Sequence, residues 1–162
     1  MSIRAIIFDF NGVIIDDEEL HFLAFQESLQ KADLILTQTL YLERYLGLND
    51  WGFYQAFFGD HPNPQTKDKA IDTWVDEKAD IYIRMLADEM PLFPQAAECI
   101  QSLSQYVPLA INSGARRHEI EKVIQWANLS SCFESIVSGD DIRNGKPAPD
   151  GYIAAYQNLK AK

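Results

Sequence analysis

Hydrophobic residues follow two different patterns along this chain, and the pattern changes near residue 92. Residues 4–9 contain a continuous apolar run that ends in Asp9, which is typical of a strand buried on both faces. Between about residues 16 and 91, apolar residues recur at three- and four-residue spacing, which indicates amphipathic helices. The pattern therefore predicts one N-terminal strand followed by a helical segment.

The helical segment divides into several pieces. Asp16 and Glu19 resemble a capping box that opens a first helix. Residues 39–58 favour two helices with a break around Gly47 to Gly52, and the prolines of residues 61–64 require a loop. A long amphipathic helix is predicted from about residue 71 to residue 86.

Strands and helices alternate after residue 92. Pro94 suits the first turn of a helix through about residue 105, and strands are predicted over 107–112 and 133–137. Helices are expected from Ser113-Gly114 and over 150–159. The fold class is therefore α/β, a Rossmann-type parallel sheet core with an inserted α-helical cap. We assign residues 1–15 and 92–162 to the core and residues 16–91 to the cap.

Charge and composition limit the functions that this chain can have. The formal net charge of −10 disfavours binding to nucleic acid or to an anionic membrane. No apolar run approaches the roughly 20 residues of a membrane helix, and the N-terminus shows no secretory leader, so we expect a cytoplasmic protein. Cys99 and Cys132 lack metal-ligand spacing and are expected to be buried, reduced thiols.

Three residues with complementary chemistry follow the three predicted strands. Asp9 follows the first strand, Ser113 the second, and Lys146 lies after the third. Because the carboxyl ends of parallel strands meet at one edge of a sheet, we expect these side chains to converge. The carboxylate can attack phosphorus while the hydroxyl, the ammonium and main-chain amides near Gly114 hold the phosphate oxygens. Mg²⁺ would allow the two anions to approach each other.

These residues lie in three segments that resemble the motifs of the haloacid-dehalogenase superfamily. The segments are FDFNGV at 8–13, INSG at 111–114 and GKPAPD at 145–150. The chain is most similar to the helical-cap branch of phosphatases and β-phosphoglucomutase-like enzymes. The resemblance implies that Asp9 is the nucleophile and a Mg²⁺ ligand, that the carbonyl of Asn11 is a second ligand, and that Ser113 and Lys146 hold the phosphate.

The resemblance also suggests substrate contacts, each with a simpler alternative. His21 falls where the cap begins in this branch and would face substrate, although a packed core histidine is equally consistent with the sequence. Arg116 and Arg117, just beyond Gly114, could bind an anionic substrate or could simply be the solvated start of a helix.

The sequence departs from the family pattern at Asn11, where an aspartate is usual. That aspartate protonates the leaving oxygen and later activates water. An amide cannot exchange a proton at neutral pH, so general acid–base help worth about 10²–10⁴-fold is expected to be lost. The substitution therefore predicts slow turnover through a long-lived phosphoenzyme.

The second departure is that the chain stops at Lys162, one helix after the third motif. The family pattern continues with further strands, the next of which ends in an acidic pair that completes the metal site. Asp140 and Asp141 precede Lys146 and are poor substitutes for that pair. A sheet without those strands would expose an edge, through which a homodimer could form.

These observations leave three hypotheses open. The first is a Mg²⁺-dependent phosphatase or phosphomutase-type hydrolase that acts on a small phosphorylated metabolite through Asp9 and is impaired both by Asn11 and by the lack of the fourth motif, which carries the acidic pair. The second is a non-catalytic protein that binds phosphorylated ligands or regulates other proteins. The third is cleavage of another bond, such as carbon–phosphorus, for which Lys31 is the only Schiff-base candidate in the early cap.

Overall fold

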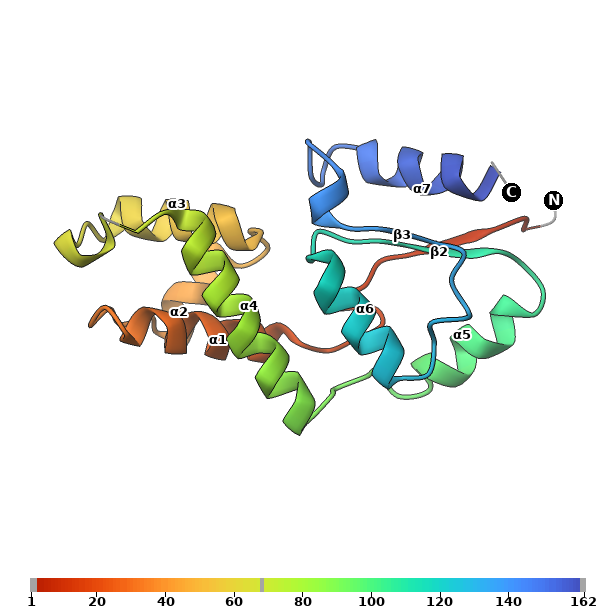
Figure 1. Ribbon diagram of the computed structural model, residues 1–162, viewed down its shortest axis with the longest axis horizontal. Helices are drawn as coiled ribbons and strands as arrows, with labels where there is room; N and C mark the ends of the chain where they lie inside the picture. Colours follow the sequence, from red (N-terminus) through yellow and green to blue (C-terminus); the bar gives the residue numbers. More distant parts are fainter. Residues whose placement is uncertain (1–2, 68, 161–162) are drawn as a thin grey trace. The chain divides into compact units, whose positions relative to one another are not determined.

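The computed structural model describes residues 3–67 and 69–160 and divides into two compact units. The first, which we call the core unit, comprises the described residues up to Asp17 and from Met90 onward. The second, the helical unit, is Glu18–Glu89. Each unit has its own set of elements (Figure 1).

A three-stranded parallel sheet forms the centre of the core unit. Its strands are β1 (Ile6–Phe8), β2 (Leu109–Asn112) and β3 (Ser135–Val137), in the order β1-β2-β3. Ala110 pairs with Ile7 on one side and with Ser135 on the other. Every residue of β2 is buried, as expected for a central strand of a sheet covered on both faces. The predicted α/β fold with a parallel sheet is confirmed.

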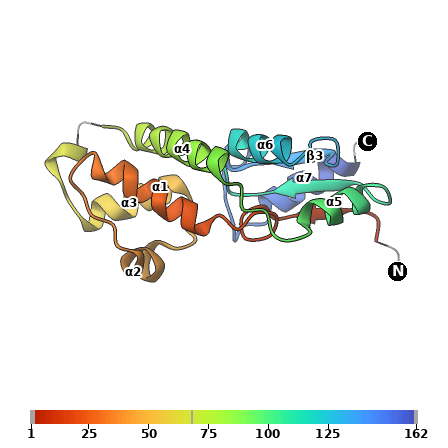
Figure 2. The ribbon, with the colours of Figure 1, turned by 90° about the horizontal axis from the view of Figure 1, so that it is seen from below.

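Three helices cover the sheet. Helix α7 (Asp150–Lys160) lies on one face, and α5 (Ala96–Ser104) and α6 (Arg117–Trp126) lie on the other (Figures 1 and 2). On the α7 face, Ala155 packs with Ala110 and Val137 in a small buried cluster. A 3₁₀ turn, η3 (Gly139–Asp141), follows β3. The carboxyl ends of the strands are therefore held on a scaffold that is packed from both sides.

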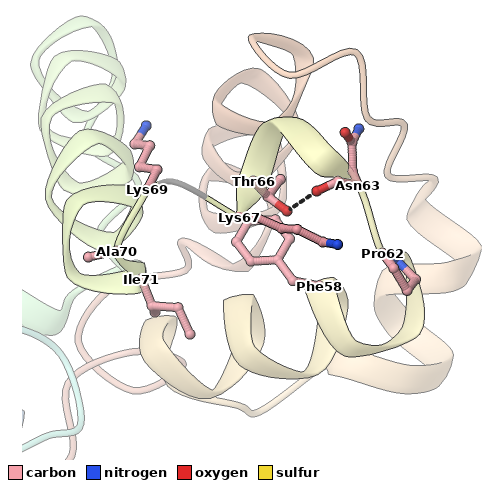
Figure 3. A pocket seen from close by; sticks show the side chains of 8 residues that line it. All are labelled: Phe58, Pro62, Asn63, Thr66, Lys67, Lys69, Ala70 and Ile71. Atoms are coloured by element: carbon pink, nitrogen blue, oxygen red, sulfur yellow. Dashed lines mark hydrogen bonds between the residues drawn. The ribbon is translucent and has the colours of Figure 1, made fainter.

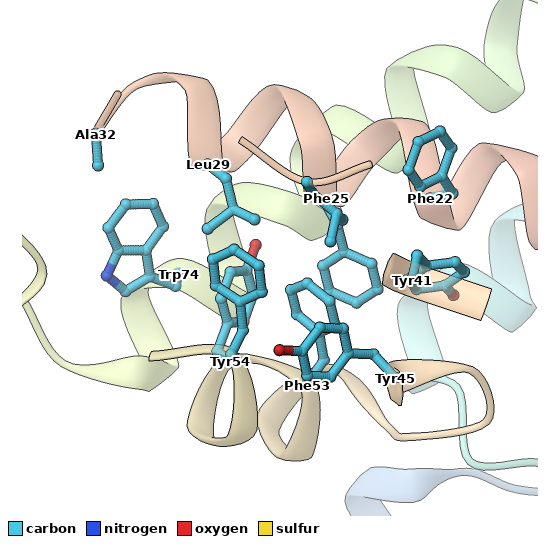
Figure 4. Close-up of a cluster of buried hydrophobic side chains, with 11 residues drawn as sticks. Phe22, Phe25, Leu29, Ala32, Tyr41, Tyr45, Phe53, Tyr54 and Trp74 are labelled. Atoms are coloured by element: carbon cyan, nitrogen blue, oxygen red, sulfur yellow. The ribbon is translucent and has the colours of Figure 1, made fainter. Parts of the chain in front are cut away.

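The helical unit contains no strand within its described residues, 18–67 and 69–89. Its elements are α1 (Glu18–Gln30), α2 (Gln38–Leu40), the π-helical η1 (Tyr41–Tyr45), α3 (Asp50–Asp60), the 3₁₀ turn η2 (Pro64–Thr66) and α4 (Ile71–Asp88). Aromatic rings fill its centre (Figure 4). Phe53 stacks on Phe25 with ring centroids 3.7 Å apart and also meets Tyr45, Tyr54 and Phe57. This unit is stabilised chiefly by aromatic burial.

The two chain segments that leave the core unit are hydrogen-bonded to each other. Ile15 forms an antiparallel bridge with Leu92. The Asp16 amide donates to the Pro91 carbonyl at 2.8 Å, and the Phe93 amide donates to the Ile14 carbonyl at 3.1 Å. These bonds lie entirely within the core unit and fix the points at which the helical unit is inserted.

Several predicted element bounds are wrong, and backbone conformation explains them. Helix α5 begins at Ala96 rather than at Pro94, because Gln95 has a left-handed φ of 65° that interrupts the helix. Helix α6 begins at Arg117 rather than at Ser113, because the Ser113 hydroxyl accepts from the Ala115 amide and forms a turn instead.

In the helical unit, the break between the two helices predicted over residues 39–58 is shorter than expected. Residues 46–49 separate η1 from α3, and Gly52 lies inside α3 rather than in the break. The Asn49 side chain caps α3 by accepting from the Gly52 amide at 2.8 Å.

Cys99 is exposed and Cys132 partly exposed, so the expectation that both thiols are buried is also wrong. None of the helices in the described residues is long and apolar enough to span a membrane.

Candidate active site

The turn after β1 places Asp9 at the carboxyl end of the sheet. Phe10 is fully buried and anchors the turn, while Gly12 adopts a φ of 72°, which favours glycine. The Gly12 amide donates to the Ile15 carbonyl at 2.8 Å, and this bond closes the turn. The Phe10 amide donates to Asp9 Oδ1, also at 2.8 Å. The carboxylate is therefore held by the backbone that follows the strand.

Lys146 forms a direct ion pair with Asp9. Its Nζ lies 2.5 Å from Asp9 Oδ2, and the two side chains are 37% and 35% exposed. Lys146 lies on the segment between η3 and α7, and its ammonium is also 5.8 Å from the centroid of the Tyr152 ring on α7. Because both groups remain accessible, a phosphate can reach the carboxylate and the ammonium together.

Ser113 connects the end of β2 to the same site. It is buried, and its Oγ donates to Asn11 Oδ1 at 3.2 Å while accepting from the Ala115 amide at 3.0 Å. Its own amide donates to the Val137 carbonyl at 2.9 Å, which ties the ends of β2 and β3 together. The structure thus places Asp9 beside Lys146 and Asn11 beside Ser113 at the strand ends, in what we call the polar cluster, and their roles in catalysis stay predictions.

Asp17 also belongs to this cluster, and the sequence pattern did not identify it. The carboxylate is 1% exposed, and its Oδ2 accepts from Asn11 Nδ2 at 2.7 Å. We expected the neighbouring Asp16 to cap the first helix, but α1 begins at Glu18, so Asp17 stands immediately before it. The feature of the sequence that could have identified Asp17 is the pair of adjacent aspartates, Asp16 and Asp17, the second of which lies six residues after Asn11.

The arginines after the second strand are engaged with acidic residues of the loop that follows β3. Arg117 Nη2 donates to Asp141 Oδ2 at 2.6 Å and to the Ile136 carbonyl at 3.0 Å. Arg116 Nε lies 3.8 Å from Asp140 Oδ1. These contacts occupy Arg117 in particular, and a role for either arginine in substrate binding stays a prediction.

The Arg117–Asp141 pair shifts the pKa of both groups. Burial alone would raise the pKa of Asp141, but hydrogen bonds from Ser138 and from Arg117 outweigh it and hold that pKa below its ordinary value. Burial likewise opposes the charged form of Arg117, yet Asp141 and Glu121 raise its pKa. The pair also holds together the loop next to Gly114, where Gly139 lies so close to the Gly114 carbonyl that a Cβ would overlap it.

His21 lies in the helical unit, within a buried charged cluster. Its ring stacks on Tyr82 with centroids 4.4 Å apart, and its Nδ1 is 2.6 Å from Lys78 Nζ. Lys78 is fully buried, and its ammonium lies 3.0 Å from each carboxylate oxygen of Asp50. A contact between His21 and substrate stays a prediction.

The helical unit also has a surface hollow of about 390 Å³, lined by Phe58, Lys67, Lys69 and Ile71 among others (Figure 3). Lys69 Nζ lies 2.6 Å from Glu77 Oε1 and 3.7 Å from the centroid of the Trp74 ring. The hollow is lined only by residues of the helical unit, whereas the polar cluster around Asp9 belongs wholly to the core unit.

The donors near Asp9 suit a hard divalent cation with few protein ligands. The residues expected to hold it, the Asp9 carboxylate and the main-chain carbonyl of Asn11, both supply oxygen, the donor atom that Mg²⁺ prefers. Among residues 3–67 and 69–160, no group of three or more His, Cys, Asp or Glu side chains could enclose a metal. The two oxygen donors of Asp9 and Asn11 are of the kind that fits Mg²⁺, which commonly keeps several waters and shares the phosphates of its substrate.

A parallel sheet with an aspartate, a hydroxyl and a lysine at its strand ends defines a phosphatase-type hydrolase scaffold. A model of the haloacid dehalogenase-like hydrolase family matches residues 6–162, and the chain belongs to this family. The resemblance predicted from the three motifs is thereby confirmed.

Curated and solved relatives agree with this assignment. Pyrophosphatase PpaX of Oceanobacillus iheyensis is 27% identical over 163 residues, which cover 99% of this chain and 71% of PpaX. Protein CbbY of Rhodobacter capsulatus is 29% identical, with coverage of 98% and 73%. A crystal structure of mutant CbbY from Rhodobacter sphaeroides in complex with xylulose-(1,5)bisphosphate superposes with a TM-score of 0.86 at 26% identity, covering 98% of this chain and 73% of that one.

Proposed function

We propose that the protein is a Mg²⁺-dependent phosphatase that transfers the phosphoryl group of a small phosphorylated metabolite to Asp9. The observation that carries this proposal is the cluster at the strand ends, in which the Asp9 carboxylate pairs with Lys146 at 2.5 Å. Ser113, at the end of β2, forms a hydrogen bond with Asn11, two residues after Asp9. The names of relatives also support the proposal, because they include a pyrophosphatase and a fructose-1-phosphate phosphatase.

The reaction has two steps. In the first, an Asp9 carboxylate oxygen forms a bond to phosphorus, and the bond from phosphorus to the ester oxygen breaks. The leaving oxygen takes a proton from water and departs as an alcohol. In the second, a water oxygen forms a bond to phosphorus and loses a proton to solvent. The bond between phosphorus and the Asp9 oxygen breaks, which regenerates the carboxylate and releases inorganic phosphate.

Each residue of the cluster has a separate task in these steps. Lys146 and Ser113 hold the equatorial oxygens as charge develops on them. Mg²⁺, held by Asp9 and the Asn11 carbonyl, would reduce the repulsion between the carboxylate and the phosphate. The Asn11 side chain can accept a hydrogen bond from water but cannot remove its proton. We therefore expect the second step to limit turnover, and we expect activated leaving groups to speed only the first step, formation of the phosphoenzyme.

The test is phosphate release from a panel of sugar phosphates and one aryl phosphate, with Mg²⁺ and with EDTA. Asp9→Asn should abolish the Mg²⁺-dependent release, because the nucleophile is lost. Asp72→Asn, at an exposed position on α4, is the matched control and should leave the rate unchanged. Equal phosphate release by the natural protein and by the Asp9→Asn variant would refute the proposal, as would failure of acetyl phosphate to label the intact protein.

Asn11 also supports a second candidate, a non-catalytic protein that binds phosphorylated ligands. Its amide leaves the phosphate-holding residues Ser113 and Lys146 in place while removing the usual proton-transfer group. This candidate predicts that phosphorylated ligands raise the melting temperature without being hydrolysed. Turnover in the natural protein that disappears in Asp9→Asn would exclude it.

The oligomeric state of the protein and the cellular compartment in which it acts are also part of this proposal. Among the described strands, β1 and β3 each pair with β2 alone, so each leaves one edge of the sheet open, and we expect a homodimer to form through such an edge. Light scattering at several protein concentrations tests this expectation, and a monomer throughout would contradict it. We expect the protein to act in the cytoplasm, which fractionation of cells that express it would check.

A further inference from the structure

We infer that Asp17 is a positioning residue that fixes the side-chain amide of Asn11, so that positions 11 and 17 work as a single amide–carboxylate pair. The inference rests on the proposed function for its kinetic consequences. Its structural part, the coupling between the two positions, stands on the contact between Asn11 Nδ2 and Asp17 Oδ2, which are 2.7 Å apart.

The contact determines which way the amide faces. An ionised carboxylate only accepts hydrogen bonds, so it attracts the NH₂ of an amide and repels its oxygen. Asp17 is 1% exposed, and a buried charged acceptor without a donor is costly. Asp17 therefore binds Asn11 Nδ2 and turns Asn11 Oδ1 away, toward Ser113 Oγ at 3.2 Å. Both hydrogen bonds agree on the same orientation of the amide.

This orientation matters for the water that attacks the phosphoenzyme. When Ser113 donates its proton to a bound phosphate instead, Asn11 Oδ1 is left as a hydrogen-bond acceptor beside Ser113 Oγ. It can then accept a hydrogen bond from water and direct a lone pair of that water toward phosphorus. The opposite orientation would present NH₂, which donates to the water and occupies the lone pair that must attack. Asp17 thus acts on the second step through Asn11.

The same geometry predicts that Asn11→Asp alone has a cost as well as a benefit: it adds a general base but destabilises the protein. It would place two carboxylates in contact, one of them almost fully buried, and like charges at that distance repel strongly. Adding Asp17→Asn would restore a hydrogen bond between an amide and a carboxylate, with the amide donor now at position 17 and the carboxylate acceptor at position 11. The carboxylate would then stand at position 11, where it can take the proton of the attacking water. The benefit of an aspartate at position 11 should therefore depend on the residue at position 17.

The experiment compares four proteins: the natural chain, Asn11→Asp, Asp17→Asn, and the double variant. Phosphoenzyme formation and decay are followed with acetyl phosphate and Mg²⁺, and melting temperatures are measured in parallel. Asp17→Asn should slow phosphoenzyme decay about tenfold while formation changes less than about threefold, because an amide at position 17 no longer enforces one orientation. Asp16→Asn, exposed and adjacent in sequence, is the matched control.

The double variant is the decisive protein. Asn11→Asp should melt about 3–8 °C below the natural chain, and the double variant should recover most of that loss. Its phosphoenzyme should decay about 10²-fold or more faster than the natural one, because the general base is restored. Additive changes in melting temperature across the cycle would overturn the inference. An equal gain in Asn11→Asp alone would do the same.

The failure of the inference can be distinguished from that of the proposed function. If acetyl phosphate labels none of the four proteins, the proposed function fails. The melting-temperature cycle still decides whether positions 11 and 17 are coupled. If labelling succeeds and Asp17→Asn leaves both steps unchanged, the proposed function stands and the positioning role is rejected.

Discussion

Two lysine–aspartate pairs, one in each unit, have opposite surroundings. In the core unit, Lys146 and Asp9 meet at the strand ends with more than a third of each side chain exposed. In the helical unit, Lys78 is fully buried against Asp50, and its ammonium lies 4.9 Å from the ring centroids of both Phe25 and Tyr82. The same two functional groups are therefore accessible in one unit and enclosed in the other.

The difference separates a pair that a ligand can open from a pair that holds a fold together. A phosphate can replace the contact between Lys146 and Asp9, because both groups keep access to solvent. Opening the Lys78–Asp50 pair would leave a charge among aromatic rings, which is costly. Exposure, rather than the presence of an ion pair, distinguishes the candidate catalytic lysine from the structural one.

The largest expected effect is on stability, in the helical unit. Lys78→Met should lower the free energy of unfolding by about 3–5 kcal/mol, because it leaves the Asp50 carboxylate without its buried cation. Urea denaturation measures this loss. The double variant Lys78→Met/Asp50→Leu should recover most of it, because no charge remains to be paired. A single variant as stable as the natural chain would mean that the buried pair has no structural role.

The next effect is on catalysis, in the core unit. Lys146→Met should reduce Mg²⁺-dependent phosphate release about 10²–10³-fold, since it removes one charged group that holds the phosphoryl oxygens. Its melting temperature should stay close to that of the natural chain, because the side chain is well exposed. Lys122→Met, exposed on α6, is the matched control. Equal rates for the two variants would remove Lys146 from the candidate site.

A third prediction concerns the contact that joins α7 to β2. A Cβ at Gly151 would overlap Oδ1 of Asn112, a side chain that is 1% exposed. Gly151→Ala should therefore cost about 1–3 kcal/mol of unfolding free energy through overpacking. Gly59→Ala, on α3 with nothing within 4 Å of the added carbon, should cost nothing comparable. Similar urea midpoints for the two variants would show that Asn112 can move aside.

Alkaline pH should affect the helical unit through Tyr45. Burial, reinforced by its hydrogen bond to Asp60, raises the pKa of this phenol from 10 to about 12. Because the folded pKa lies above the unfolded one, the stabilisation is complete below pH 10 and is lost as the pH rises through 12. Tyr45→Phe should reduce this dependence in denaturation curves measured between about pH 9 and pH 12, while burial of Tyr54, which also raises the pKa of that phenol, keeps part of it. Tyr106→Phe, at an exposed position, should keep it.

The smallest effect is expected at Asp141, in the core unit. Its folded pKa is lowered, so the stability that it contributes is present above its ordinary pKa of 3.8 and is lost as the pH falls below that value. Both Asp141 and Arg117 are more than a third exposed, so we expect Asp141→Asn to cost less than about 1 kcal/mol. Acid titration of the melting temperature checks this, with Asp80→Asn as the control. A larger loss would indicate that this pair, too, is structural.

The sequence was sufficient to predict the α/β fold and the placement of Asp9, Ser113 and Lys146 at the ends of the strands, but not Asp17. Parallel strands place their carboxyl ends at one edge, so Asp9, Ser113 and Lys146 could be brought together without coordinates. Their partners could not be predicted in the same way. Lys78 and Asp50 are 28 residues apart on different helices, and no periodic pattern relates them.

Local conformation set a second limit on prediction. The choice between Asp16 and Asp17 depends on where α1 begins, and the start of α5 depends on the left-handed conformation of Gln95. Both are decided by a single residue's dihedral angles or hydrogen bonds, whereas hydrophobic periodicity averages over several residues. For this reason, the hydrophobic pattern did not identify Asp17, the residue that binds the side chain of Asn11.

The isolated bridge between Ile15 and Leu92 has a consequence for engineering. It ties the exit and the return of the chain side by side, through hydrogen bonds made wholly within the core unit. A grafted domain or a short loop of glycine and serine could therefore replace residues 18–89, because the two chain ends that it must connect already lie side by side. The bridge therefore makes the helical unit exchangeable while the strand ends of the core unit keep their geometry.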